Sequence, residues 1–360
     1  MARRTGVTEL PLHYGAAPRW LFERMTALAR QLVLVLVEEF GPLEVVRRLS
    51  DPFWFQAFGC ALGFDWHSSG VTTVVCGALK EALRDIAADA GLYVAGGKGK
   101  TSRRTPEELL IVGERTGVDP GPLIYASRMA AKVDTAGLQD GYQIYHHTFI
   151  YTPYGDGQGA WCVVQQGMNP EARLARRYHW LSTELRDFVC EPHAAVCCDR
   201  RGEVLNMVAH EAARAREVSA RLAAERPEKV AKELERLREL RLPRRHETLL
   251  SDIDPQRIKK ILLHTYEQQP ATFEALLGTP GVGAKTIRAL ALVSELLYGA
   301  PASFRDPVRF SYAHGGKDGH PYPVDRETYD RTIEALRAAV TRARLGHRER
   351  LDALRRLAVF

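Results

Sequence analysis

Features of membrane and secreted proteins are scarce in this sequence of 360 residues. No stretch reaches the roughly 18 apolar residues of a membrane-spanning helix, because Glu38 and Glu39 end the apolar run at 31–37. The N-terminus has no apolar signal-peptide region. Six cysteines are too few for a disulfide scaffold in a chain of this length. We therefore expect a cytoplasmic protein with reduced thiols and no membrane partner.

The composition is that of a mildly basic globular protein. Apolar residues make up 45% and charged residues 26% of the sequence, which is ordinary for a folded chain. The net charge of +6 agrees with a nucleic-acid partner but does not establish one. The length predicts two domains, whereas nothing in the sequence indicates an oligomeric state.

Residues 1–205 predict a mixed, α+β domain. Helices are expected at 18–39, from Pro52 after Asp51, at 71–89, and at 106–116 with Thr105 as its cap. The strongest strand pattern is a β-hairpin near 142–165. Its strands are 142–151 and 160–165, and the turn residues 153–157 connect them.

The remainder of the chain predicts helices alone. Residues 206–246 alternate Arg and Glu and are interrupted at Pro227, which is typical of a charged helical linker. Residues 247–360 predict an all-α helix-hairpin-helix domain, with helices at 255–267, 271–277, 284–298 and 326–343.

Residues 279–286 carry the most specific pattern. An apolar helix meets Pro280-Gly281-Val282-Gly283, and a second apolar helix starts at once with Lys285 and Thr286 in its first turn. Glycines allow a tight turn and a close approach to another surface. The first amides of a helix, together with its dipole, favour an anion. We therefore expect Gly281, Gly283, Lys285 and Thr286 to grip a DNA phosphate without reading sequence. A plain glycine turn between helices is the alternative.

Pro323-Val324-Asp325 follows the hairpin further along the chain. This order of the two motifs resembles the endonuclease III superfamily of DNA glycosylases. There the hairpin lysine attacks C1′ of the damaged nucleotide and the aspartate assists, so the resemblance implies Lys285 as nucleophile and Asp325 as its carboxylate. The separation, 325 − 285 = 40 residues, is longer than in that superfamily, and residues 301–321 fill the excess. No iron–sulfur cluster is expected, because Cys198 is the last cysteine. Phosphate contact by Lys285 and helix capping by Asp325 remain the alternative.

A metal-dependent nuclease site is a second hypothesis. Asp134, Asp140, His146 and His147 are close in sequence beside the β-hairpin, and such ligands suit Mg²⁺ or Mn²⁺ with Asp140 as a catalytic carboxylate. Neighbouring strand residues face opposite sides, so at most one histidine joins a given site. The second strand also lacks the Glu-x-Lys of restriction-type nucleases. A buried polar network is the alternative.

The glycine-rich segment 96–104 is strongly basic. It resembles an ATP-binding phosphate loop, but Val94 stands where the leading glycine is needed, and no strand–loop–helix pattern is evident. A nucleic-acid contact suits it better, through its four cations, Lys98, Lys100, Arg103 and Arg104. An exposed, solvated loop is the alternative.

Two weaker patterns involve residues 178–198. Cys190, His193, Cys197 and Cys198 approach zinc-site spacing, with His210 beyond, although small buried thiols are the simpler interpretation. Tyr178, His179 and Trp180 follow several arginines, which suits either stacking on an unpaired base or the buried face of one helix.

The whole chain is similar to the archaeal and thermophile family known as domain of unknown function 763. The motifs that carry the resemblance span nearly the full length: residues 4–15, 139–147, 164–169, 177–180, 305–307 and 313–319. This resemblance implies no known activity. From the residues we expect a protein of DNA repair or processing, acting by base excision. The alternatives are a metal-dependent, structure-specific nuclease and a non-enzymatic DNA-binding subunit.

Overall fold

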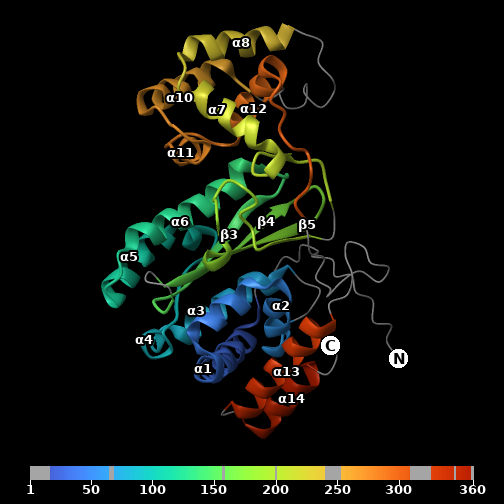
Figure 1. Cartoon of the computed structure of the whole chain (residues 1–360). Helices are drawn as coiled ribbons and strands as arrows, with labels where there is room; N and C mark the ends of the chain where they lie inside the picture. The colour runs from blue at the N-terminus through green and yellow to red at the C-terminus, as the bar shows by residue number, and fades with distance from the viewer. Residues whose placement is uncertain are drawn as a thin grey trace.

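The computed structural model describes residues 17–64, 69–155, 159–198, 201–239, 253–308, 326–343 and 346–357. Asp325 and the segment 309–325 lie outside the described residues. Figure 1 shows an antiparallel sheet between two helical layers, so the predicted α+β mixture of helices and sheet is confirmed.

The lower layer in Figure 1 is formed by the first helices, with two later helices beside them. Its N-terminal elements are α1 (Arg19–Ser50), α2 (Pro52–Ala61), α3 (Gly70–Leu83) and α4 (Ala87–Ala90). Helix α1 kinks at Gly41, where φ is 80°, because Pro42 follows it. The carboxylate of Asp51 accepts hydrogen bonds from the amides of Phe53 and Trp54, which confirms the predicted start of α2.

Five strands form the sheet in the order β1-β3-β4-β5-β6, and every neighbouring pair is antiparallel. They are β1 (Tyr93–Lys98), β3 (Gln143–Thr152), β4 (Ala160–Asn169), β5 (Leu174–Leu181) and β6 (Ala195–Cys197). The β3–β4 pair confirms the predicted hairpin. Side chains alternate as a two-sided sheet requires: Phe149 and Val163 enter the upper core, while Ile150 and Val164 enter the lower one.

Helices α5 (Thr105–Thr116) and α6 (Pro120–Lys132) cover the upper face, and a π-helical turn, η2 (Val133–Gly137), continues α6. The predicted capping of α5 by Thr105 is wrong, because Thr105 is itself helical and its hydroxyl donates to the Ser102 carbonyl. After η2 comes β2 (Leu138–Gln139), which pairs with β7 (Leu205–Asn206) in a separate two-stranded ribbon.

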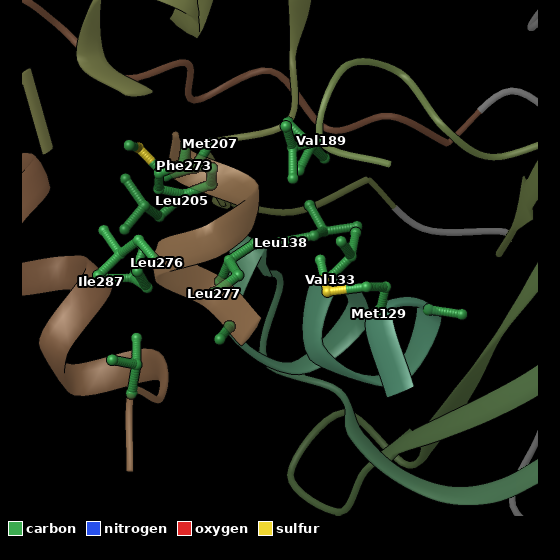
Figure 2. Close-up of a cluster of buried hydrophobic side chains, with 14 of the residues drawn as sticks. Met129, Val133, Leu138, Val189, Leu205, Met207, Phe273, Leu276, Leu277 and Ile287 are labelled. Atoms are coloured by element: carbon green, nitrogen blue, oxygen red, sulfur yellow. The ribbon is translucent and has the colours of Figure 1, made fainter. Parts of the chain in front are cut away.

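Further helices lie above α6: α7 (Ala213–Ala223), α8 (Pro227–Glu239), α10 (Pro255–Gln268), α11 (Phe273–Gly278) and α12 (Ala284–Tyr298). Figure 2 shows how this layer joins the sheet. Leu277 of α11 and Ile287 of α12 belong to the same buried cluster as Met129, Val133 and Leu138 from α6, η2 and β2. The α11–α12 pair is therefore packed directly onto the part of the fold that carries the sheet.

The final helices return to the lower layer. Leu336 of α13 (Arg326–Arg342) and Leu357 of α14 (His347–Leu357) share a core with α1, α2 and α3. Helices α7 and α8, by contrast, pack with α10 and α12. The predicted division of the chain at residues 205 and 246 stays a prediction. No helix among the described residues is long and apolar enough to cross a membrane.

Candidate nucleic-acid interface

The turn between α11 and α12 is tight, as the glycine pattern predicts. The amide of Val282 donates to the carbonyl of Thr279 at 3.2 Å, and the Val282 side chain is buried. Gly281 has φ of 84°, in the left-handed region that strongly favours glycine. The backbone of this turn therefore explains Gly281 without reference to any partner.

Gly283 has no comparable structural reason to be glycine. It precedes α12 with φ of −142° and ψ of −172°, an extended conformation that any residue adopts. A Cβ atom at this position would meet no atom of the described chain within 4 Å, apart from the neighbouring residues. The fold therefore tolerates a side chain at position 283, and the surface in front of it is open.

Two side chains from below fix the hairpin in place. Lys132, at the end of α6, donates from Nζ to the Val282 carbonyl oxygen at 2.5 Å. Gln139 of β2 donates from Nε2 to the Ala284 carbonyl at 2.9 Å and accepts from Nε of Arg288 at 3.1 Å. Burial lowers the pKa of Lys132. The sequence patterns did not predict this role for either residue, because each of the three contacts joins segments about 150 positions apart.

The predicted contact residues of the hairpin differ in exposure. Both Gly281 and Lys285 are exposed, as a contact with another molecule requires. Thr286 is only 1% exposed, so its side chain points into the helical core. The phosphate contact predicted for this residue stays a prediction, with its backbone amide in the first turn of α12 as the available donor.

The basic segment 98–104 forms a short 3-10 helix, η1 (Gly99–Arg104), between β1 and α5. The strand–loop–helix order that was not evident from the sequence is thus present. An ATP site is still disfavoured, because the Glu108 carboxylate already accepts the Gly96 amide at 2.7 Å. The side chains of the four predicted cations, Lys98, Lys100, Arg103 and Arg104, are all exposed.

Asp134 lies at the centre of a buried hydrogen-bond network. Its Oδ2 accepts from Nε2 of Gln165 at 2.5 Å and from Nε1 of Trp180 at 3.0 Å. Its Oδ1 is 2.5 Å from Nε2 of His193. With three donors around it, this fully buried carboxylate has a hydrogen-bond partner on each oxygen.

The same network fixes the tautomer of His147. Gln165 donates through its nitrogen to Asp134 and to the Ala130 carbonyl, so its Oε1 accepts from Nδ1 of His147 at 2.8 Å. Nε2 of His147 then accepts from the Ser127 hydroxyl at 2.9 Å. Burial lowers the pKa of His147, which keeps the ring neutral near pH 7.

Asp140 belongs to a second, separate network. It accepts from Nη1 of Arg176 at 2.9 Å and from the Tyr178 hydroxyl at 2.7 Å, and Nη2 of Arg176 reaches Asp306 at 2.8 Å. Burial opposes the charge of Arg176, but Asp140, Tyr178 and Asp306 outweigh burial and raise its pKa. This is a buried ion triad in which Arg176 satisfies both carboxylates.

The four residues of the metal hypothesis are not brought together. Asp134 and Asp140 bond to different partners, and His146 bonds to Thr148 on the opposite face of β3 from His147. Within the described ranges, no group of three or more His, Cys, Asp or Glu side chains is arranged to hold a metal ion. The zinc candidates are similarly engaged, because His193 contacts Asp134 and Sγ of Cys198 lies 3.3 Å from the Tyr142 hydroxyl.

The prediction that Tyr178, His179 and Trp180 form a helix face or stack on a base is wrong. They lie in β5 and are completely buried. Tyr178 and Trp180 point toward Asp140 and Asp134, whereas His179 packs on Phe55 of α2 from the other face. The alternation along β5 accounts for both sets of contacts.

Comparison with known proteins places the chain in a family without assigning it an activity. No curated protein and no solved structure matches it. One family model covers residues 6–324, which is most of the sequence and includes the hairpin, both carboxylate networks and the basic segment. On that match, this chain belongs to the family described as protein of unknown function, DUF763.

Proposed function

We propose that this protein binds the sugar–phosphate backbone of DNA through the α11–α12 hairpin and acts in DNA repair or processing. The observation that carries the proposal is Gly283. It is the N-cap of α12, in an extended conformation beside open space, where neither the backbone angles nor the packing require glycine. Such a glycine suits close approach of another molecule's backbone.

The electrostatics of the hairpin favour an anion at that point. The first backbone amides of α12 point away from the helix, and its 15 residues give a dipole that is positive at this end. Lys285 adds an exposed cation in the first turn. Lys132 donates to the Val282 carbonyl, and Gln139 donates to the Ala284 carbonyl. These contacts fix the first backbone amides of α12 in place before DNA binds.

The segment Gly99–Arg104 supplies a second basic surface with exposed lysines and arginines, Lys98 of the preceding strand included. Contacts of this kind bind phosphates without reading bases, so affinity falls steeply with salt. We propose that it contributes to binding and not to sequence preference.

Base excision is the chemistry that we propose for the bound DNA, with Lys285 as the nucleophilic amine and Asp325 as the assisting carboxylate. An exposed lysine is a weak nucleophile, so DNA would have to desolvate the Lys285 amine on binding. The nuclease alternative has less support, because Asp134 and Asp140 are both saturated by hydrogen bonds.

The test compares Gly283→Asp with Gly283→Asn in binding to duplex DNA of unrelated sequences. Both residues are good helix N-caps, so the fold is expected to keep its stability. Only aspartate adds a negative charge where the phosphate would lie. We expect Gly283→Asp to weaken binding at least tenfold on every sequence, and Gly283→Asn to weaken it less. Wild-type affinity in Gly283→Asp would overturn the proposal.

Chemistry is tested on the same preparation with abasic, uracil-containing and nicked duplexes, in Mn²⁺ or in EDTA, with borohydride trapping. A trapped adduct in EDTA that is lost in Lys285→Ala supports base excision. Product only with metal supports the nuclease. Binding without product in either condition supports a non-enzymatic DNA-binding subunit.

A further inference from the structure

A cavity of about 280 Å³ lies beside the two carboxylate networks and is not used by the hairpin. Its walls come from the segment before β6, from the β7 region and from the segment that follows α12. The lining residues are Glu191, His193, Val196, Arg201, Asn206, Val208, Ala209, Arg305, Asp306, Pro307 and Val308. The volume is close to the lower end of the roughly 300–1,000 Å³ of small-molecule pockets, so the cavity has room for a single compact ligand.

His193 is the most distinctive group in this lining. Its side chain is only 6% exposed, and Nε2 is fixed by the fully buried carboxylate of Asp134. Within the part of the chain that the structure describes, no hydrogen bond is made by its Nδ1. A carboxylate that orients one imidazole nitrogen leaves the other positioned for a ligand, as in enzyme sites that use a histidine for hydrogen bonding or proton transfer.

The charges around the cavity are largely compensated. Arg305 pairs with Glu191 and Glu211, at 3.2 and 3.1 Å, and Asp306 pairs with Arg176. Arg201, which is exposed, donates to the Val308 carbonyl and makes no ion pair with a described carboxylate. The remaining lining side chains are aliphatic except for Asn206, whose amide group donates to the Arg305 carbonyl and accepts from the Val208 amide.

This combination matches a nucleotide. Aliphatic walls suit the two faces of a base, an oriented imidazole suits its polar edge, and an arginine suits its phosphate. A larger ligand would not fit the volume, and a simple anion would leave the aliphatic walls without a partner.

The cavity is connected to the proposed DNA contact through the β2–β7 ribbon. Asn206, one of its lining residues, pairs with Leu138 across the β2–β7 ribbon, and the next residue of β2, Gln139, holds the first residue of α12. The ribbon thus links the cavity to the start of the helix at which a phosphate is expected.

We propose that this cavity receives one unpaired nucleotide of the DNA held by the hairpin, with its base hydrogen-bonded to Nδ1 of His193 and its phosphate held by Arg201. This inference rests on the proposed DNA binding for its substrate, but the cavity itself can be tested without DNA.

The first probe is deoxyadenosine 5′-monophosphate, followed by saturation-transfer NMR and calorimetry on the full chain. Two variants alter the cavity. Ala209→Leu fills it, and His193→Gln keeps a donor toward Asp134 while removing the ring nitrogen. We expect each to weaken mononucleotide binding about tenfold or more. Gly283→Asp, with its change at the hairpin, is expected to bind the mononucleotide as the wild type does. Thermal unfolding of each variant checks that it is folded.

The second probe is duplex DNA with one unpaired 2-aminopurine, whose fluorescence reports its surroundings. We expect both cavity variants to bind fully paired duplex normally and to lose the fluorescence change of the unpaired base. Wild-type protein that binds duplex but neither the mononucleotide nor the unpaired base overturns the cavity proposal alone. Unchanged binding of both probes in His193→Gln and Ala209→Leu overturns it as well. Mononucleotide binding without any duplex binding overturns the hairpin proposal instead.

Discussion

Lys132 and Val282 are 150 positions apart in the chain, yet the ammonium group of Lys132 donates to the Val282 carbonyl at 2.5 Å. The contact joins the end of α6 to the turn that precedes α12. Because α6 packs on the sheet, this contact fixes the hairpin relative to the sheet. The hairpin is therefore held by α6 as well as by its own two helices.

Replacing this lysine tests that support. Lys132→Met removes the donor and leaves the Val282 carbonyl without it, so we expect unfolding free energy to fall by about 1 kcal/mol. DNA binding is expected to weaken because the turn is less well fixed. Arg128→Met, one helical turn earlier at an exposed position, is the control for stability. Equal denaturation midpoints for the two variants would contradict the role of Lys132.

Substitution of Asp140 is predicted to destabilise the fold through its ion pair with Arg176. The resulting loss of activity could be mistaken for the loss of a catalytic residue. Asp140→Asn is expected to destabilise the protein by about 3–5 kcal/mol, because it leaves a buried guanidinium with one carboxylate. The exposed Asp85→Asn is the matched control and should leave the unfolding temperature unchanged. If Asp140→Asn is as stable as Asp85→Asn, the ion triad does not stabilise the fold, and a functional role for Asp140 becomes the better explanation.

Buried histidines predict loss of stability in acid. Burial, with smaller contributions from His147 and Lys98, lowers the pKa of His146 from 6.5 to about 3, and burial lowers the pKa of His147 and His179 too. The unfolded chain therefore binds protons more readily than the native one. The stability from these neutral rings is complete above about pH 6.5 and is lost as the pH falls toward 3.

The His146→Gln variant isolates one of these groups. Its unfolding free energy, measured by denaturant titration from pH 7 to pH 4, should depend less steeply on pH than that of the wild type. His347→Gln, at an exposed position, should follow the wild-type curve. Parallel curves for all three proteins would show that His146 does not contribute to acid sensitivity.

The two hairpin glycines are predicted to respond differently to alanine. Gly281→Ala forces a side chain into the left-handed region and should cost roughly 1–2 kcal/mol of unfolding free energy. Gly283→Ala meets open space at an extended backbone, so only a modest loss of N-cap preference is expected. Thermal unfolding without DNA distinguishes them, and a larger loss at 283 would mean that the fold needs that glycine after all.

Local patterns were sufficient for much of the fold. Helix α12 has the predicted bounds 284–298, because a glycine turn starts it and Gly299 ends it. The β3–β4 hairpin was predictable from alternating aromatic and β-branched residues. Strand β5 was missed because two arginines and a histidine made the segment appear too polar for a buried strand. The burial of the two arginines depends on partners that are distant in sequence, because Arg176 pairs with Asp140 and Asp306 and Arg177 donates to Gln56.

The candidate site likewise has some residues that a local pattern predicts and others that depend on distant contacts. Gly281, Gly283 and Lys285 follow from one short motif. Lys132 and the Asp134–His193 contact do not, since each depends on which segments the topology brings together. Spacing along the chain grouped His193 with nearby cysteines, whereas the fold places it on a carboxylate 59 positions away.

The return of α13 and α14 to the first helices has a consequence for synthesis. Leu32 and Val46 of α1 share their core with Leu336 and Leu357, so the lower layer lacks part of its interior until α13 and α14 have left the ribosome. The upper layer, made from residues 213–298 and α6, draws its core from segments that emerge earlier. The core of the proposed DNA-binding surface can therefore assemble before α13 and α14 are made, whereas the core of the lower layer is completed only after them.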